Sequence, residues 1–509
     1  MNLRALALVA SLSAFCAAIP LDSILAPQTS VSAQTASPQD EPPAFTLLEP
    51  VAPLPIPTPE QLRYQGSMNA LVHFGMATFF HDGDPGCDRE NWNGCDPNGG
   101  CNSSDVRSFN PTNINVSNWV DSFLSLGVTS AVLTAKHGCG FLAWHTKTTL
   151  PDGTEYPYHV SDEQATAQRF VAATSAAGIG HGFYYSLTNN FYLNVRGHNV
   201  QPPSSLLPGQ ANVTQSQYED LALAQVTELW TEFGGLTEIW LDGGCGAMCD
   251  KVGSLVRKLQ PSAVVFNGGG VSDSPLRWCG TESGDPVPIG GHVWSTSACA
   301  DTWCGDGSGS GAPPNASGAI WQPSGVDVTL QEGDRWFYMP GAKLHPLEDL
   351  VSFYHRSVGM NAHLEIDFAI SRSGEVDPSH AVAYKNFGAW IRSCYGSPLA
   401  VNSLLYGQTS FIILLPSSGA IIDRIMLQED QSRGQFIVSY VVEAQVRGAW
   451  QPFSSGVSVG QKRIDIGAAV LATSVRVSVT EAWATPTGLT ASVFAPGPCA
   501  LAAFEYPTL

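Results

Sequence analysis

The sequence predicts an α/β domain of the (β/α)8 barrel type, followed by a smaller domain with the organisation of a β-sandwich. Short apolar stretches such as residues 237–241 alternate with amphipathic stretches of helical length, such as residues 163–177 and 214–233. This alternation is typical of units in which a helix joins two parallel strands. After residue 396 the pattern changes to short alternating runs between turn residues, which is typical of a β-sandwich or jelly roll.

The chain divides into four expected segments. Residues 1–18 have the organisation of a secretory signal peptide, with a positive charge near the start and a short apolar run over residues 5–15. Residues 19–58 are rich in Pro, Ser, Ala and Gln and show no period, so we interpret them as a flexible lead-in. The barrel is expected over residues 59–396 and the β-sandwich over residues 397–509.

The composition restricts the kinds of partner. The 509 residues carry a formal net charge of −20 at pH 7. This charge disfavours binding to nucleic acid or to an anionic membrane surface and is compatible with an uncharged substrate. The apolar run near the N-terminus is too short to span a membrane comfortably, and no later stretch qualifies. We therefore expect a secreted, extracellular protein with no nucleic-acid or membrane partner; the sequence does not indicate its oligomeric state.

Cysteines and glycosylation sequons are compatible with secretion. Of twelve cysteines, Cys16 lies in the signal peptide, so eleven remain and at least one is unpaired or bridges two chains. We expect Cys139 to be the free thiol. The spacings lack the paired C-x₂-C units of zinc sites, which favours disulfides over a metal. The sequons place candidate glycosylation sites at Asn102, Asn115, Asn212 and Asn315.

The candidate catalytic site centres on a carboxylate at the end of a short strand. Residues 237–241 are followed by Asp242 and then by Gly243 and Gly244. Glycine permits a sharp turn and the close approach of a ligand. In a (β/α)8 barrel the catalytic groups lie at the C-terminal ends of the strands. Asp242 is therefore a candidate catalytic carboxylate, and an Asp-Gly turn that caps the next helix is the alternative interpretation.

Several further stretches form an ordered series with this one. Residues 71–75 read Leu-Val-His-Phe-Gly, residues 109–112 read Phe-Asn-Pro-Thr, and residues 133–141 contain Lys136-His137. The series, which spans roughly residues 65–395, resembles the α-L-fucosidases of glycoside hydrolase family 29, especially their plant-like branch. The resemblance implies hydrolysis of terminal α-L-fucose from oligosaccharides or glycoconjugates by double displacement, with retention of configuration and without a metal or other cofactor.

The resemblance also assigns roles to individual side chains. Asp242 matches the nucleophile, and Glu282, in the stretch 277–284, matches the glutamate that serves as general acid/base. A surface glutamate in a glycine-containing loop is the alternative interpretation of Glu282, and Glu332 is then the next candidate for the acid/base. The side chains expected to bind the sugar are His73, Trp92, His137, Trp144, Tyr184, Tyr185 and Arg277.

Two departures from the family pattern leave alternatives open. The pattern Lys-His-His-Asp-Gly-Phe is replaced by residues 136–141, in which Gly138 and Cys139 remove a hydrogen-bonding group from the sugar pocket. The acidic residue expected directly before Trp92 is absent. These departures motivate a second hypothesis, a fucose-binding lectin that has lost activity, although the retained carboxylates argue against it. A barrel glycosidase for a different sugar is a third hypothesis.

Residues 425–440 resemble the galactose-binding-like sandwich of plant-like relatives, which either binds glycan or only packs on the barrel.

Overall fold

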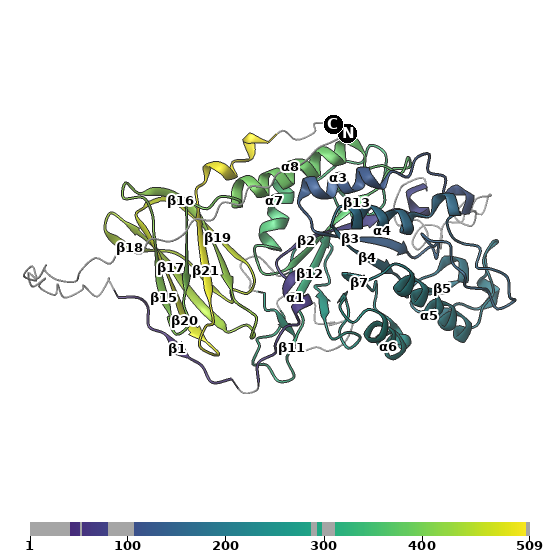
Figure 1. Ribbon diagram of the computed structural model, residues 1–509, viewed down its shortest axis with the longest axis horizontal. Helices are drawn as coiled ribbons and strands as arrows, with labels where there is room; N and C mark the ends of the chain where they lie inside the picture. The colour runs from purple at the N-terminus through teal and green to yellow at the C-terminus, as the bar shows by residue number, and fades with distance from the viewer. Residues whose placement is uncertain (1–40, 51–52, 80–105, 287–292, 298–310, 505–509) are drawn as a thin grey trace, which may run out of the picture. The chain divides into compact units, whose positions relative to one another are not determined.

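The structure is a computed structural model that describes residues 41–50, 53–79, 106–286, 293–297 and 311–504, and its central element is a closed barrel of parallel strands (Figure 1). Around the barrel the strands are β12 (Ser324–Val328), β13 (His363–Ala369), β2 (Met68–His73), β3 (Ser130–Lys136), β4 (Gly180–Tyr185), β7 (Glu238–Trp240), β8 (Val264–Phe266) and β9 (Pro275–Trp278). Every neighbouring pair is parallel, including the closing pair of β9 and β12. The predicted (β/α)8-like barrel is thereby confirmed.

Helices follow most of the barrel strands. They are α3 (Val116–Leu126), α4 (Thr166–Ala176), α5 (Gln215–Glu232), α6 (Cys249–Leu259), α7 (Leu347–Arg356) and α8 (Pro378–Tyr395), and α1 (Pro59–Tyr64) precedes β2. Local sequence explains several helix ends: Thr214 and Gln217 form a capping box at the start of α5, and Gly127, with φ +98°, ends α3. Residues 267–274 join β8 to β9 without a helix. Among the described helices, none combines the length and the apolar character needed to cross a membrane.

Short elements occupy the connections between the barrel strands and helices. Two short antiparallel strand pairs are formed by β5 (Val195–Arg196) with β6 (Asn199–Val200), and by β10 (Thr296–Ser297) with β11 (Ile320–Trp321). The 3₁₀ helices are η1 (Met76–Phe79), η3 (Val106–Ser108), η4 (Asp162–Gln164), η5 (Phe191–Leu193), η6 (Pro203–Ser205), η7 (Gly246–Met248), η8 (Gly497–Cys499) and η9 (Leu501–Ala503). Several of these follow the C-terminal ends of strands, where the candidate site lies.

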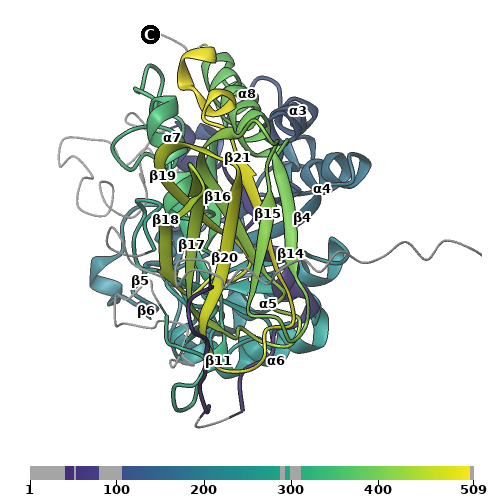
Figure 2. The same cartoon turned by 90° about the vertical axis from the view of Figure 1, so that its left-hand side faces the viewer.

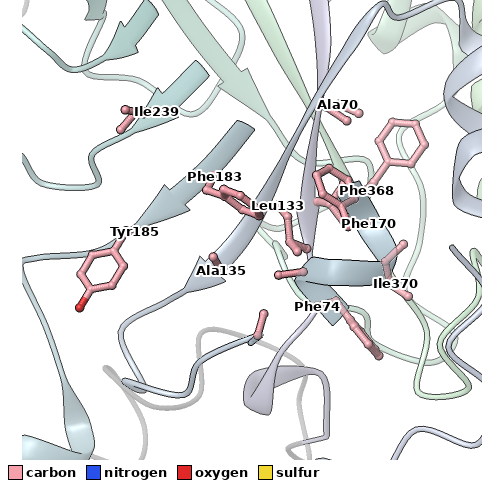
Figure 3. Packing of buried hydrophobic residues seen from close by; sticks show 14 of the residues in the cluster. Ala70, Phe74, Leu133, Ala135, Phe170, Phe183, Tyr185, Ile239, Phe368 and Ile370 are labelled. Atoms are coloured by element: carbon pink, nitrogen blue, oxygen red, sulfur yellow. The ribbon is translucent and has the colours of Figure 1, made fainter. Parts of the chain in front are cut away.

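Alternate residues of each barrel strand face the surrounding helices and the barrel interior. The outward layer is apolar and fully buried, and Figure 3 shows four members from neighbouring strands, Ala70, Leu133, Phe183 and Ile239. Phe170 of α4 packs against this layer, with its ring centroid 6.3 Å from that of Phe183. The inward layer contains Leu71, Val132, Tyr184, Trp240, Phe266 and Leu276. Packing on both sides fixes each strand, so the inward residues at the C-terminal ends have defined positions.

The barrel interior also contains a buried polar network. Asn69 donates a hydrogen bond to Glu238 (3.3 Å), and Nε2 of His363 lies 3.0 Å from Oε1 of Glu365. Burial raises the pKa of Glu365 to about 8 and raises the pKa of Glu238 well above its ordinary value. The raised pKa values favour the protonated forms of these carboxyls, which avoids uncompensated charges inside the barrel.

The C-terminal part forms a β-sandwich, as the alternating sequence pattern predicts. One sheet has the order β1-β20-β17-β18 with β15 also on β20, and the other has the order β14-β21-β16-β19 (Figure 2). The strands are β14 (Ala400–Leu404), β15 (Ser410–Leu414), β16 (Ala420–Glu429), β17 (Ile437–Val446), β18 (Ala449–Val457), β19 (Arg463–Ala472), β20 (Ser474–Ala482) and β21 (Leu489–Phe494). Strand β1 (Thr46–Leu47) pairs in parallel with β20, so part of the stretch that we expected to be flexible is an ordered strand.

Disulfides within the described residues correct one expectation. Cys245 and Cys249 form a disulfide directly after Asp242, which excludes the zinc interpretation for this pair. Cys394 and Cys499 form a second disulfide across 105 residues, for which the loss of chain entropy predicts a stabilisation of about 5 kcal/mol. The prediction that Cys139 is a free thiol is wrong, because Cys139 is disulfide-bonded. Cys279, which is buried, carries a thiol instead.

Candidate active site

Asp242 lies directly beyond the C-terminal end of β7, and two hydroxyl groups position it. The Tyr184 hydroxyl donates a hydrogen bond to Oδ2 of the Asp242 carboxylate (2.6 Å), and Thr188 donates to the backbone carbonyl of Asp242 (2.8 Å). The two following glycines have φ values of +66° and +76°. A Cβ atom on Gly243 would lie 2.2 Å from Oγ1 of Thr188, so only glycine fits. The backbone turn that presents Asp242 therefore depends on the local sequence.

Two histidines lie beside Tyr184 and border the site. The ring of His137 stacks on Tyr184 (5.6 Å between centroids), and the ring of His73 lies 6.1 Å from that of His137. Nδ1 of His73 lies 2.8 Å from a carboxylate oxygen of Asp367 at the end of β13. Burial, with a smaller effect of His137, lowers the pKa of His73 well below its ordinary value. His73 is therefore neutral, with its proton on Nδ1 and a lone pair on Nε2.

Glu282 follows β9 and faces an open cleft. Its side chain accepts a hydrogen bond from Nε1 of Trp336 (3.3 Å). Glu282, Trp278 and Phe353 are among the residues that line a cleft of about 540 Å³. Glu282 is exposed in the described part of the structure, whereas Trp278 beside it is half-buried. An exposed carboxyl beside a cleft at a strand end is accessible to a substrate.

A continuous series of contacts links the two carboxylates. Tyr184 contacts Asp242, and the ring of Tyr184 lies 6.2 Å from that of His73. The ring of His73 lies 5.2 Å from that of Trp336, which donates its hydrogen bond to Glu282. Asp242 and Glu282, from different strands, thus border one site, as residues at the C-terminal ends of barrel strands are expected to do.

Asp327, at the end of β12, is a third carboxyl of this site that the sequence analysis missed. It is buried and accepts a hydrogen bond from Nε1 of Trp278 (2.8 Å). Burial, together with the charges of Glu282 and Asp242, raises the pKa of Asp327 to about 8. Asp327 therefore holds a proton at neutral pH and adds no negative charge beside Asp242 and Glu282.

Three of the expected binding residues are directed away from this site. Trp144 is fully buried and donates a hydrogen bond from Nε1 to Glu228 of α5 (3.1 Å). Tyr185 belongs to the outward layer shown in Figure 3, and its hydroxyl donates to Gln225 of α5 (2.7 Å). The Arg277 guanidinium donates to Ser324 on the neighbouring strand. Because neighbouring residues of a strand face opposite sides, Tyr184 and Tyr185 cannot both reach the pocket.

The paired state of Glu332 and the exposure of the candidate glycosylation sites complete the comparison with the expected residues. Glu332 forms an ion pair with Lys343 (2.7 Å) and is not among the residues that line the cleft beside Glu282. Trp92 and Asn102 lie outside the described residues. Asn212 is exposed, whereas Asn115 caps α3 and its amide donates a hydrogen bond to Glu375 (3.0 Å). Asn315 is half-buried.

Replacement of Asp327 by asparagine tests the protonated state of this carboxyl. The pKa of Asp327 is about 8 in the folded protein and about 3.9 in an unfolded chain. The folded state thus binds more protons, so the free energy of unfolding falls as pH rises through this window. Asp327→Asn should make the fall shallower in denaturant titrations at several pH values. The exposed Asp273→Asn should leave the slope unchanged, and equal slopes for wild type and Asp327→Asn would refute the assignment.

The fold and the site together define a class of protein. A parallel barrel with two carboxylates at strand ends has the layout of a glycoside hydrolase. The family model described as alpha-L-fucosidase matches residues 102–396, which is more than half of the chain. The chain therefore belongs to the α-L-fucosidase family, glycoside hydrolase family 29.

Individual relatives agree with this assignment. Alpha-L-fucosidase 1 of Arabidopsis thaliana is 27% identical over 457 residues, which cover 81% of this chain and 81% of the plant protein. A provisionally named α-L-fucosidase 1 of Oryza sativa subsp. japonica is 26% identical over 466 residues, with coverage of 82% and 80%. The crystal structure of a provisionally named α-L-fucosidase of Bacteroides thetaiotaomicron has a TM-score of 0.72 at 26% identity, covering 87% of this chain and 99% of that chain. The similarity extends over both the barrel and the sandwich.

Proposed function

We propose that this chain is a secreted, retaining exo-α-L-fucosidase that releases terminal L-fucose from oligosaccharides or glycoconjugates. The observation that carries the proposal is the set of contacts that places Asp242 and Glu282 on one site through Tyr184, His73 and Trp336. The family membership supplies the sugar, and the plant α-L-fucosidase among the relatives supports that choice.

In the proposed reaction, the Asp242 carboxylate attacks C1 of fucose while Glu282 donates its proton to the glycosidic oxygen. The bond from C1 to that oxygen breaks, and an ester joins the sugar to Asp242. Glu282 then removes a proton from water, which attacks C1 and releases fucose and the Asp242 carboxylate. Two inversions at C1 give net retention of configuration.

The neighbouring side chains fit these roles. The hydrogen bond from Tyr184 fixes the position of the Asp242 carboxylate. His73, held neutral and oriented by Asp367, offers the Nε2 lone pair to a sugar hydroxyl. The rings of Trp336 and Phe337, which both contact His73, provide apolar surface for the C6 methyl group of fucose. Trp336 and Phe337 were not among the side chains that the sequence analysis expected to bind the sugar.

Several sequence features support secretion. Residues 1–18 have the organisation of a signal peptide, the disulfides suit an oxidising compartment, and the sequon at Asn212 is exposed. Asn212 is therefore the sequon most accessible to a glycan among those that the structure describes.

The purified mature chain is expected to release L-fucose from an aryl α-L-fucoside and from fucosylated oligosaccharides. Mass spectrometry of the products from oligosaccharides with different fucose linkages measures the release. The corresponding α-D-galactosides and β-D-galactosides are the controls for a different sugar. No release from any fucoside, together with measurable fucose binding by calorimetry, would favour the lectin hypothesis. Hydrolysis of another glycoside in preference to fucosides would contradict the choice of sugar.

A further inference from the structure

A cluster of two histidines and two carboxylates lies on the segment between β3 and α4, apart from the groups that link Asp242 to Glu282. Nε2 of His145 and Nε2 of His159 lie 2.9 Å and 3.0 Å from the same oxygen, Oε1 of Glu155. The two imidazole rings are stacked, with centroids 4.6 Å apart and planes inclined by 15°. The backbone brings them together, because residues Leu142 and His159 form a parallel bridge.

The second nitrogen of each ring is already occupied by an acceptor. Nδ1 of His145 contacts a carboxylate oxygen of Asp162, and Nδ1 of His159 lies 2.6 Å from the backbone carbonyl oxygen of Val160. A carbonyl and an ionised carboxylate only accept hydrogen bonds, so each Nδ1 carries the proton. In a neutral imidazole this leaves a lone pair on each Nε2.

Three possible metal ligands therefore face one another. Nε2 of each histidine is directed at Glu155, whose side chain is 55% exposed. Carboxylates on both sides of the His145 ring favour a positive charge at this place. A divalent metal ion among the three ligand atoms would supply that charge.

The geometry points to a zinc-type metal site formed by His145, His159 and Glu155. Two imidazole nitrogens and a carboxylate oxygen are ligands that Zn²⁺ accepts, with water in the fourth position. Bonds of about 2.0–2.2 Å in a tetrahedron place the ligand atoms about 3.3–3.5 Å apart, so the observed separations of 2.9 Å and 3.0 Å need to widen only slightly. The contacts of Nδ1 with Asp162 and Val160 have the form by which proteins orient histidine ligands of metals.

The described residues contain two other groups of His, Asp and Glu side chains whose ligand atoms lie close together. Neither is as well suited to a metal ion. In the buried group of Glu238, His363 and Glu365, burial raises the pKa of both carboxyls, which disfavours the ionised forms that bind metal ions. In the group of Glu332, His345 and Asp349, the Glu332 carboxylate already forms an ion pair with Lys343. The site at His145 is also reachable from solvent, since the His145 side chain is 41% exposed.

A bound ion would crosslink the two ends of the segment that runs from His145 to His159. This segment begins just after residues 137–141, and hydrogen bonds join Leu142 to Tyr158 (2.9 Å) and Val160 to Leu142 (3.0 Å). The inferred role of the metal is therefore structural, and the site is independent of the hydrolytic reaction. An ion that binds only the folded state raises the unfolding temperature.

The test is a calorimetric titration of ZnCl₂ into the mature, tag-free protein after treatment with EDTA and removal of the chelator. We expect one Zn²⁺ per chain and an unfolding midpoint that rises by a few degrees in excess Zn²⁺. His145→Gln and His159→Gln should each weaken binding at least about tenfold, since each removes one of three protein ligands.

His345→Gln is the matched control, because it alters a histidine beside carboxylates in the other exposed group. It should bind Zn²⁺ as the wild type does. Circular dichroism of each variant shows that the fold is retained. The proposal fails if the wild type takes up no Zn²⁺, if both His145→Gln and His159→Gln bind it as the wild type does, or if only His345→Gln abolishes binding.

Discussion

Replacement of Asp242 by glycine should nearly abolish turnover of every α-L-fucoside, while fucose still binds. The variant lacks the carboxylate that is proposed to attack C1 and that accepts the Tyr184 hydrogen bond. Loss of a catalytic nucleophile typically costs several orders of magnitude in kcat. Initial rates with an aryl fucoside measure the loss, and Asp273→Gly, at an exposed aspartate that forms an ion pair with Arg257 (3.1 Å), is the control.

Added azide distinguishes a variant that has lost only the nucleophile from a variant that no longer folds. In Asp242→Gly the anion can occupy the space left by the carboxylate and attack C1 directly. A single inversion from an α-L-fucoside with a good leaving group gives the β-L-fucosyl azide, which NMR identifies. Turnover by Asp242→Gly near the wild-type rate without azide would contradict the role of Asp242.

Replacement of Glu282 by alanine should produce an effect that depends on the leaving group. Natural fucosides have poor leaving groups and need protonation of the glycosidic oxygen, and general acid catalysis contributes about 10²–10⁴-fold. Activated aryl fucosides need little protonation, so their first step should be affected far less. The ratio of kcat/KM for an activated aryl fucoside and a fucosylated oligosaccharide measures the difference.

Glu332→Ala is the matched variant for this experiment. Glu332 was the alternative acid/base in the sequence analysis, but its carboxylate forms an ion pair with Lys343. Glu332→Ala should therefore slow both substrate classes little and equally. If Glu332→Ala shows the dependence on leaving group and Glu282→Ala does not, the acid/base is Glu332. For Glu282→Ala, azide should give the α-L-fucosyl azide, because the ester on Asp242 still forms.

The sequence was sufficient to predict the features that depend on local signals. The short apolar stretch before Asp242, followed by two glycines, is strand β7 and a turn with positive φ angles. The helical periodicity over residues 214–233 is α5, and the alternating runs after residue 396 are strands of the sandwich. These signals arise from neighbouring residues, so no tertiary contact is needed to detect them.

The direction of a side chain and its contacts with residues far away in the sequence could not be predicted from such local signals. The choice between Tyr184 and Tyr185 depends on the register of β4, which the barrel sets. Trp144 looked like a binding residue from its place in a motif, yet its indole is buried against α5. Asp327 lies within β12, whose sequence Ser-Gly-Val-Asp-Val has no strong apolar pattern. Because no strand was predicted there, Asp327 was not recognised as a residue near a strand end. Trp336 offers no local signal for its contact with Glu282.

The central claim is that Asp242 forms the covalent intermediate, and trapping of that intermediate tests it most directly. A 2-deoxy-2-fluoro-L-fucosyl fluoride slows both steps by withdrawing electrons near C1, while the fluoride leaving group keeps formation of the ester faster than its hydrolysis. Peptide mass spectrometry of the inactivated protein then locates the added sugar. The account predicts one label per chain, on the peptide that contains Asp242. A label on Glu282 or another carboxylate, or a fucosidase that the reagent leaves unlabelled and that yields β-L-fucose as its first product, would contradict it.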